Sequence, residues 1–282
     1  MQHRNRRGRA VSRLALLALL SPALAFASDC EHAQPRSLDL DLAGVRTVRI
    51  EVNSHELRLG PAGDGPASFT ARACASDPAL FEQLRFTQER QGDVLVVRAE
   101  RDGYSSGIFF KSNYATLQLD ARLPATLAYE VRVGSGDAWI SGQPNVRVDV
   151  GSGDADVRGA TGLLRVKVGS GDVMAFDSGT LDVLSVGSGD LEARGVRGEA
   201  AVGDIGSGDV AIHTVGRSLR VESVGSGDLV ATDVDGGVSI GSVGSGDVSV
   251  SDVGEGLSVR RIGSGEVNHR DVRGPVDLPS DD

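Results

Sequence analysis

Acidic side chains recur at a near-constant spacing through the second half of the chain. The tetrapeptide Gly-Ser-Gly-Asp occurs seven times and Gly-Ser-Gly-Glu once, at intervals of 17 to 19 residues. The acidic members are Asp137, Asp154, Asp172, Asp190, Asp209, Asp228, Asp247 and Glu266. Carboxylate oxygens are ligands that Ca²⁺ prefers, and some glycine-rich repeats bind this ion between successive turns. The column is therefore a candidate calcium ladder.

Turn capping is the other interpretation of these acids, and the sequence favours it. Each carboxylate can accept hydrogen bonds from backbone N–H groups of its own glycine turn while it extends into solvent. Calcium repeats of the Gly-Gly-x-Gly-x-Asp type have a different spacing, and we identify no second carboxylate at a fixed offset. We therefore expect no cofactor, with calcium binding as the alternative.

The remaining motifs do not indicate enzymatic chemistry. An active site needs one differentiated group of residues, whereas the serines and acids of the motif repeat identically. The five histidines include no HExxH pair, and no Lys-Ser/Thr follows the glycines as in a phosphate-binding loop. A polysaccharide lyase or hydrolase is the competing prediction, but it would need long insertions between coils, and the repeats vary by only two residues.

The spacing of apolar residues indicates how the acids are positioned. Each repeat of about 19 residues has six aliphatic positions, which in one repeat are Val210, Ile212, Val215, Leu219, Val221 and Val224. They alternate with polar residues, a pattern typical of strands with one buried face. Stacking such repeats at about 4.8 Å per coil gives ladders of like side chains around a dry core. The sequence predicts an all-β fold with a regular β-solenoid over residues 134–282, ending in a short C-terminal cap.

The glycines of the motif are expected at the corners of the coils. We predict that they adopt positive backbone φ angles in sharp turns, which glycine does at little steric cost. On this basis, Gly208→Val should destabilise the protein more than a change at the outward-facing Ala211.

Residues 1–27 have the three parts of a secretory signal peptide: basic residues, an apolar run over 14–20 and a small-residue stretch that ends at Ala27. The run is too short for a membrane span, so we expect no membrane-spanning segment after cleavage. Losing five arginines would change the net charge from −10 to −15, which argues against nucleic acid as a partner. In an oxidising compartment, the only two cysteines, Cys30 and Cys74, would form a disulfide.

Residues 28–133 are less regular but still strand-like, and we interpret them as an irregular β cap or opening coils. Within them, residues 77–86 have the composition of a short helix. A polar, glycine-containing stretch carries Tyr104, Phe109, Phe110 and Tyr114. These aromatic residues form either an exposed loop that binds a partner or a sugar, or a hydrophobic cap on the first coil. The cap is favoured because aromatic side chains are mostly buried.

The segment LQLDARLPATLAYEVRVGSGDAWISG, followed by tandem VGSGD strands, resembles a bacterial family of exported β-strand-repeat proteins known as putative adhesins, also described through head GIN and toastrack-like domains. The resemblance implies a right-handed parallel β-helix of the bacterial envelope, with no catalytic residues. We expect a non-enzymatic, monomeric, structural or adhesin-like protein, periplasmic or at the cell surface, whose partner is an envelope protein or glycan. The alternative is a polysaccharide-binding or polysaccharide-cleaving β-helix protein with a calcium requirement.

Overall fold

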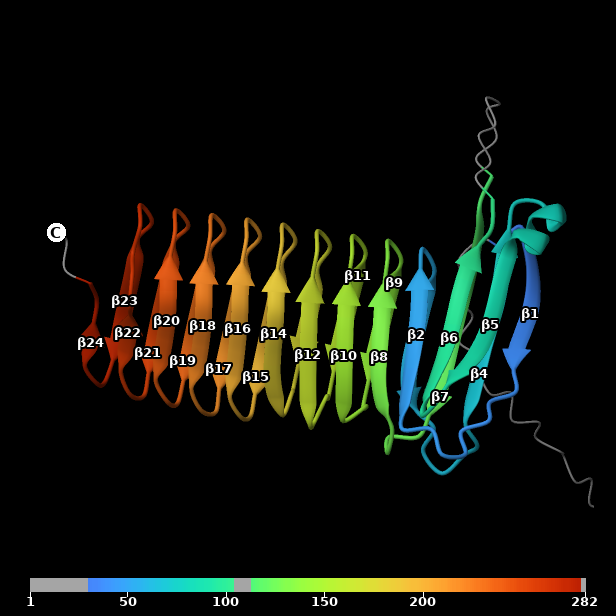
Figure 1. The fold of residues 1–282 in the computed structure, drawn as a ribbon, viewed down its shortest axis with the longest axis horizontal. Coiled ribbons are helices and arrows are strands. Elements are labelled where there is room, and N and C mark those ends of the chain that lie inside the picture. The colour runs from blue at the N-terminus through green and yellow to red at the C-terminus, as the bar shows by residue number, and fades with distance from the viewer. Residues whose placement is uncertain (1–29, 104–112, 280–282) are drawn as a thin grey trace, which may run out of the picture.

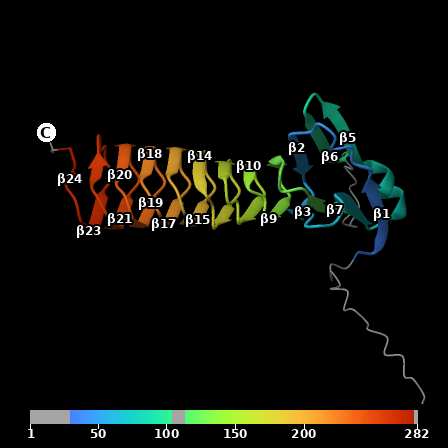
Figure 2. The same cartoon turned by 90° about the horizontal axis from the view of Figure 1, so that it is seen from below.

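The computed structural model describes residues 30–103 and 113–279. These residues form two 12-stranded sheets that face each other along a rod (Figures 1 and 2). Sheet A has the order β1 (His32–Leu38), β4 (Ser68–Ala75), β7 (Ala115–Leu123), β3 (Glu56–Pro61), β9 (Asp137–Ser141), β11 (Asp154–Arg158), β13 (Val173–Phe176), β15 (Leu191–Val196), β17 (Val210–Val215), β19 (Leu229–Val234), β21 (Val248–Val253) and β23 (Val267–Val272).

Sheet B lies opposite and has the order β24 (Val276–Asp277), β22 (Leu257–Val259), β20 (Val238–Val243), β18 (Leu219–Val224), β16 (Ala200–Ile205), β14 (Thr180–Val186), β12 (Leu163–Val168), β10 (Asn145–Val150), β8 (Ala128–Val133), β2 (Thr47–Asn53), β6 (Val94–Arg101) and β5 (Leu84–Gln91). From β8 onward, each coil gives one strand to each sheet. In Figure 1 the strands of sheet B run upward in front, and those of sheet A return behind, while the rod advances leftward. The coils therefore wind right-handedly, and the predicted solenoid is confirmed.

The six aliphatic positions of each repeat point into the space between the sheets. In the coil β17–β18, all six predicted residues are buried, from Val210 to Val224. Neighbouring coils pair in parallel and in register, so that Val210 lies beside Leu229 and Leu219 beside Val238. Like side chains thus stack on one another along the rod, and this stacking buries aliphatic side chains that a single coil would leave exposed.

The N-terminal third departs from sequential stacking. β2 pairs with both β6 and β8, and β3 pairs with both β7 and β9, all in parallel. The coil β2–β3 therefore lies between the later coil β6–β7 and the regular coils. Its corner, Asn53-Ser54-His55-Glu56, occupies the place of a Gly-Ser-Gly-Asp motif, because Glu56 pairs with Asp137. The sequence prediction of an irregular region did not identify this coil, although VNSHEL has the same apolar and acidic positions as VGSGDL.

Antiparallel strands close the N-terminal end. β4 pairs with β7, β1 pairs with β4, and β5 pairs with β6. The short helix expected over 77–86 is a 3₁₀ helix, η1 (Pro78–Gln83), and the rest of that segment begins β5. The predicted disulfide Cys30–Cys74 is confirmed, with the two Cα atoms 5.4 Å apart. Arg36 of β1 donates to the carbonyl of Phe81 at 2.7 Å, which ties the edge strand to η1.

Candidate functional site

The acid column runs along the corner where the chain passes from sheet B to sheet A. Seven of its members are exposed and Asp137 is half-buried. The backbone N–H of each acidic residue from Asp172 to Glu266 donates to the Oδ1 atom of the preceding coil's aspartate, at 2.8 to 3.2 Å. The six carboxylates from Asp154 to Asp247 thus accept from the next coil and not, as we predicted, from their own glycine turns. The column links coils together.

The glycines at this corner do not have the positive φ that we predicted. Positive φ occurs elsewhere in the described residues, for example at Asp233 and Asp252. The motif glycines are required by close stacking instead. A Cβ atom built on Gly208 would lie 1.8 Å from the carbonyl oxygen of Gly189, and the second glycine of the other motifs has the same relation to its neighbour, within 1.8 to 2.0 Å. A side chain at this position would push the coils apart.

A second carboxylate does recur at a fixed offset, which corrects the sequence analysis. Asp177, Asp233, Asp252 and Asp271 each follow a column acid by five residues, and all have φ between 53° and 60°. Aspartate tolerates this left-handed backbone conformation better than most residues, so local geometry accounts for it. Among the described residues, no group of three or more His, Cys, Asp or Glu side chains is arranged to hold a metal ion. Calcium binding stays a prediction, which calorimetric titration with CaCl₂ tests.

The predicted aromatic loop lies mostly outside the described residues, and this includes Tyr104, Phe109 and Phe110. Tyr114 is described and is exposed. Its hydroxyl accepts a hydrogen bond from the backbone N–H of Glu31 at 3.0 Å, and its own N–H donates to Ser76 Oγ at 3.2 Å. Tyr114 therefore helps to fasten the start of β1 to β4.

An exposed aromatic residue that we had not proposed lies on the outer face of sheet A. Trp139 on β9 is 41% exposed, and the guanidinium carbon of Arg58 on β3 lies 5.5 Å from its ring centroid. Two coils further along, the guanidinium carbon of Arg158 lies 4.9 Å from the ring centroid of Phe176. The alternation Ala-Trp-Ile already places Trp139 opposite to its buried neighbours. We call Arg58, Arg122, Trp139, Arg158 and Phe176 the aromatic–arginine face.

Carboxylates hold the arginines of this face in place. Arg122 Nε lies 3.1 Å from Asp120 Oδ1, and Arg158 Nε lies 2.7 Å from Asp156 Oδ1. A small hollow of about 190 Å³ is lined by Arg58, Arg122, Trp139 and Arg158, among others. Exposed arginine–aromatic pairs with fixed geometry offer both an apolar surface and directed donors.

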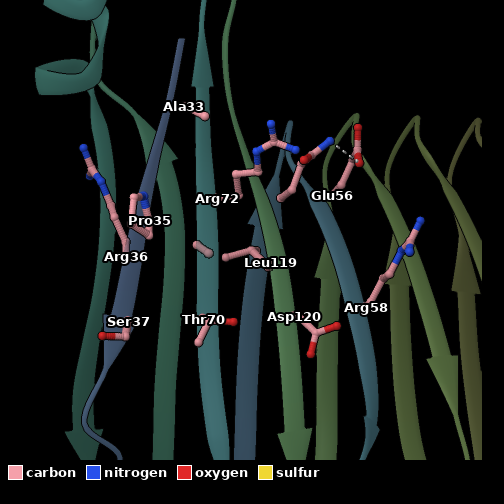
Figure 3. Close-up of a pocket in the computed structure, with 12 residues that line it drawn as sticks. Ala33, Pro35, Arg36, Ser37, Glu56, Arg58, Thr70, Arg72, Leu119 and Asp120 are labelled. Atoms are coloured by element: carbon pink, nitrogen blue, oxygen red, sulfur yellow. Dashed lines mark hydrogen bonds between the residues drawn. The ribbon is translucent and has the colours of Figure 1, made fainter. Parts of the chain in front are cut away.

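A larger hollow of about 650 Å³ adjoins this face and shares Arg58 with it. It extends over β1, β4, β7 and β3, and its charged lining residues are Arg36, Arg58, Arg72, Glu56 and Asp120. In Figure 3, the guanidinium group of Arg36 points away from the other four, because it donates to the carbonyls of Phe81 and Leu84. The Gln118 amide donates to Glu56 Oε2 at 3.4 Å, which orients that carboxylate. Sheet A thus carries one continuous polar and aromatic surface at its N-terminal end.

A buried histidine stands at the corner of the first coil. His55 is 1% exposed, and its Nδ1 atom accepts a hydrogen bond from the backbone N–H of Leu117 at 3.2 Å. Its Nε2 atom has no hydrogen-bond partner among the described residues. Burial lowers the pKa of His55 below its ordinary value, and the nearby charge of Arg101 acts in the same direction.

A family model described as Toastrack DUF4097 matches residues 45–271 of the sequence. The chain belongs to the Toastrack DUF4097 family. The matched region runs from the start of the first coil into β23, so it includes the coil β2–β3, the closing strands β4 and β5 and the regular coils up to β23, but not β1. No curated protein matches this Toastrack chain. No helix in its described part is long and apolar enough to cross a membrane.

Two solved structures have a similar fold at low sequence identity. A putative lipid binding protein from Parabacteroides distasonis is 18% identical, with a TM-score of 0.56, over 84% of the Toastrack chain and 96% of its own. A putative adhesin from Bacteroides fragilis is 14% identical, with a TM-score of 0.51, over 85% and 98% of the two chains. These likenesses show a shared fold.

Proposed function

We propose that this Toastrack protein is an exported, non-enzymatic component of the bacterial cell envelope that binds an envelope protein or glycan in an adhesin-like manner. One observation carries the proposal: the fold displays two long sheet faces of outward side chains on a rod whose regular coils are joined by short corners. Such a surface suits recognition of an extended partner, whereas catalysis needs a few differentiated groups held in one place.

The column acids support a non-enzymatic role. Cleavage of a polysaccharide by two carboxylates needs one acid and one base in different environments. The aspartates of the column instead repeat one environment, exposed and bonded to the next coil's amide. A polysaccharide-binding role does not have this requirement.

The disulfide supports export. Cys30 and Cys74 are joined, and disulfides persist in oxidising compartments such as the periplasm or the cell surface. The predicted signal peptide, residues 1–27, lies outside the described residues, and we propose that its cleavage leaves Ser28 at the N-terminus. The similarity to a putative adhesin agrees with an envelope role. We expect the exported protein to be a monomer without nucleic acid.

Fractionation and an envelope-binding assay test the proposal together. The full coding sequence is expressed in a Gram-negative host, and the N-terminus of the recovered protein is sequenced. We expect the chain to begin at Ser28 in the periplasmic or extracellular fraction. The purified protein, coupled to beads, should then retain isolated cell envelopes more strongly than beads coupled to albumin. Cytoplasmic protein that begins at Met1, or equal retention by the two kinds of bead, would overturn the proposal.

A further inference from the structure

The surface best suited to select a partner is the N-terminal end of sheet A. It combines the aromatic–arginine face with the larger hollow beside it, and together these lie on seven consecutive strands, from β1 to β13. At about 4.8 Å between strands, this surface is about 29 Å long. It is long enough to contact several units of an extended polymer.

Hydrogen bonding of the backbone excludes one mode of recognition here. The strands β4, β7, β3, β9 and β11 are each paired on both sides. No free strand edge lies within this part of the surface, so a peptide cannot bind there by adding a strand to the sheet. A partner must be recognised through side chains that project from the sheet.

The charge of the small hollow beside Trp139 differs in sign from that of the whole protein. Its lining includes three arginines, Arg58, Arg122 and Arg158, and one carboxylate, Asp156. The excess is therefore two positive charges, on a chain of net charge −10. An anionic partner is attracted to this end of sheet A and repelled by the column acids along the neighbouring corner.

The aromatic side chains add a requirement for a ligand with flat apolar faces. Trp139 and Met174 are 41% and 49% exposed and lie in one outward row, in the order Arg58, Trp139, Asp156 and Met174. Large exposed apolar side chains gathered in one place mark a binding surface. Pyranose rings have apolar C–H faces that stack on indole, and their hydroxyl groups can bond to arginine–carboxylate pairs.

We propose that the N-terminal end of sheet A binds a polysaccharide that carries carboxylate groups, such as a polymer of uronic acids. Trp139 stacks on a sugar ring, Arg58 and Arg158 bind sugar carboxylates, and the hollow over β1, β4 and β7 receives the continuing chain. This inference rests on the proposed function, because it names the class of partner.

The sequence provides a direct probe of this surface, because Trp139 is the only tryptophan in the chain. Polygalacturonate is titrated into the purified exported protein while tryptophan fluorescence is recorded. We expect a saturable change in intensity that weakens as salt is added. Neutral dextran and vesicles of phosphatidylglycerol should cause no change. Absence of a change with polygalacturonate, or an equal change with dextran or with the vesicles, would overturn the proposal.

Variants locate the binding independently of fluorescence. Affinity electrophoresis in gels that contain polygalacturonate should show binding about tenfold weaker for Trp139→Ala and for Arg158→Gln. Arg220→Gln, on the outer face of sheet B, is the matched control and should bind like the parent protein. Thermal unfolding of each variant verifies that it is folded, and Trp139→Phe, which keeps an aromatic ring, should bind more strongly than Trp139→Ala. Parent-like binding by both Trp139→Ala and Arg158→Gln would contradict the assignment.

The envelope-binding assay separates failure of this inference from failure of the proposed function. If Trp139→Ala beads lose envelope retention, the sheet A surface is the adhesive surface. If they retain envelopes as the parent does, the protein still binds envelopes, but through another surface, and only the present inference is overturned.

Discussion

At the residue scale, the side chains of the column aspartates accept hydrogen bonds from backbone N–H groups of the next coil. Asp209 Oδ1 accepts from the N–H of Asp228 at 2.8 Å. Asp209→Ala should therefore lower the free energy of unfolding by about 1 kcal/mol. Asp209→Asn keeps an acceptor and removes one of a row of like charges, so its stability should stay within about 0.5 kcal/mol of the parent. Urea unfolding at pH 7 measures both. An equal loss in the two variants would show that the charge matters and not the hydrogen bond.

The glycine beside each column acid controls how closely the coils approach. A side chain on Gly208 would meet the carbonyl oxygen of Gly189, so Gly208→Val must separate two coils. We expect a loss of about 3 kcal/mol or more. Ala211→Val places the same side chain on an outward position of the same coil and should change stability by less than about 0.5 kcal/mol. Thermal unfolding of the two variants compares them, and similar melting temperatures would show that the corner can relax.

At the element scale, burial of His55 makes the stability of the first coil depend on pH. The pKa of an unfolded histidine is about 6.5, and burial lowers that of the folded residue. Below pH 6.5 the unfolded chain takes up a proton that the folded chain does not, so stability is highest above pH 6.5 and falls as the pH decreases toward the folded pKa. Urea unfolding at pH 7.5 and pH 5.5 should show this loss. His55→Gln should reduce it, and an undiminished loss in that variant would assign the effect to other groups.

The disulfide stabilises the closing strands more than the rod. Cys30 and Cys74 are 44 residues apart, and cross-linking a loop of this length is worth about 4 kcal/mol on chain-entropy grounds. Because repeats interact mainly with their neighbours, this stabilisation should stay local. In the double variant Cys30→Ser/Cys74→Ser, hydrogen exchange should accelerate in β1 and β4 and stay unchanged in β17 and β19. Uniform acceleration along the chain would show that the rod unfolds as one unit.

Sequence periodicity predicted the regular coils because each inward position depends on local alternation and on a fixed repeat length. It could not predict the order β6–β7, β2–β3, β8–β9, since pairing of β2 with β6 depends on contacts between segments over 40 residues apart. The predicted reason for the motif glycines was wrong for a related cause. Position 208 requires glycine because the carbonyl oxygen of Gly189 leaves no room for a side chain, and a rule for local turns does not include that contact. Trp139 was predictable as outward-facing, but its stacking on Arg58 joins distant strands.

At the scale of the whole molecule, the binding surface occupies one end of the rod, whereas the acid column begins there and continues to the last coil. The arginine-rich surface lies on the strands from β1 to β13, while regular coils continue to β23. If sheet A binds a polymer at its N-terminal end, the remaining coils set how far that end stands from the other terminus. The number of coils then determines the distance between the binding surface and the other terminus, and it does not affect the binding chemistry.

Removing one coil tests this separation. Deleting residues 206–224 joins Ile205 to Gly225 and takes out β17 and β18 together, so β15 can pair with β19 and β16 with β20 in the same register. The variant should fold, with small-angle scattering showing a rod shorter by about 4.8 Å and with unchanged affinity for polygalacturonate. Deleting residues 206–215 alone removes half a coil and places a strand of sheet B where sheet A needs one, so that variant should unfold or aggregate. A full-coil deletion that unfolds like the half-coil deletion would show that the coils are not interchangeable units.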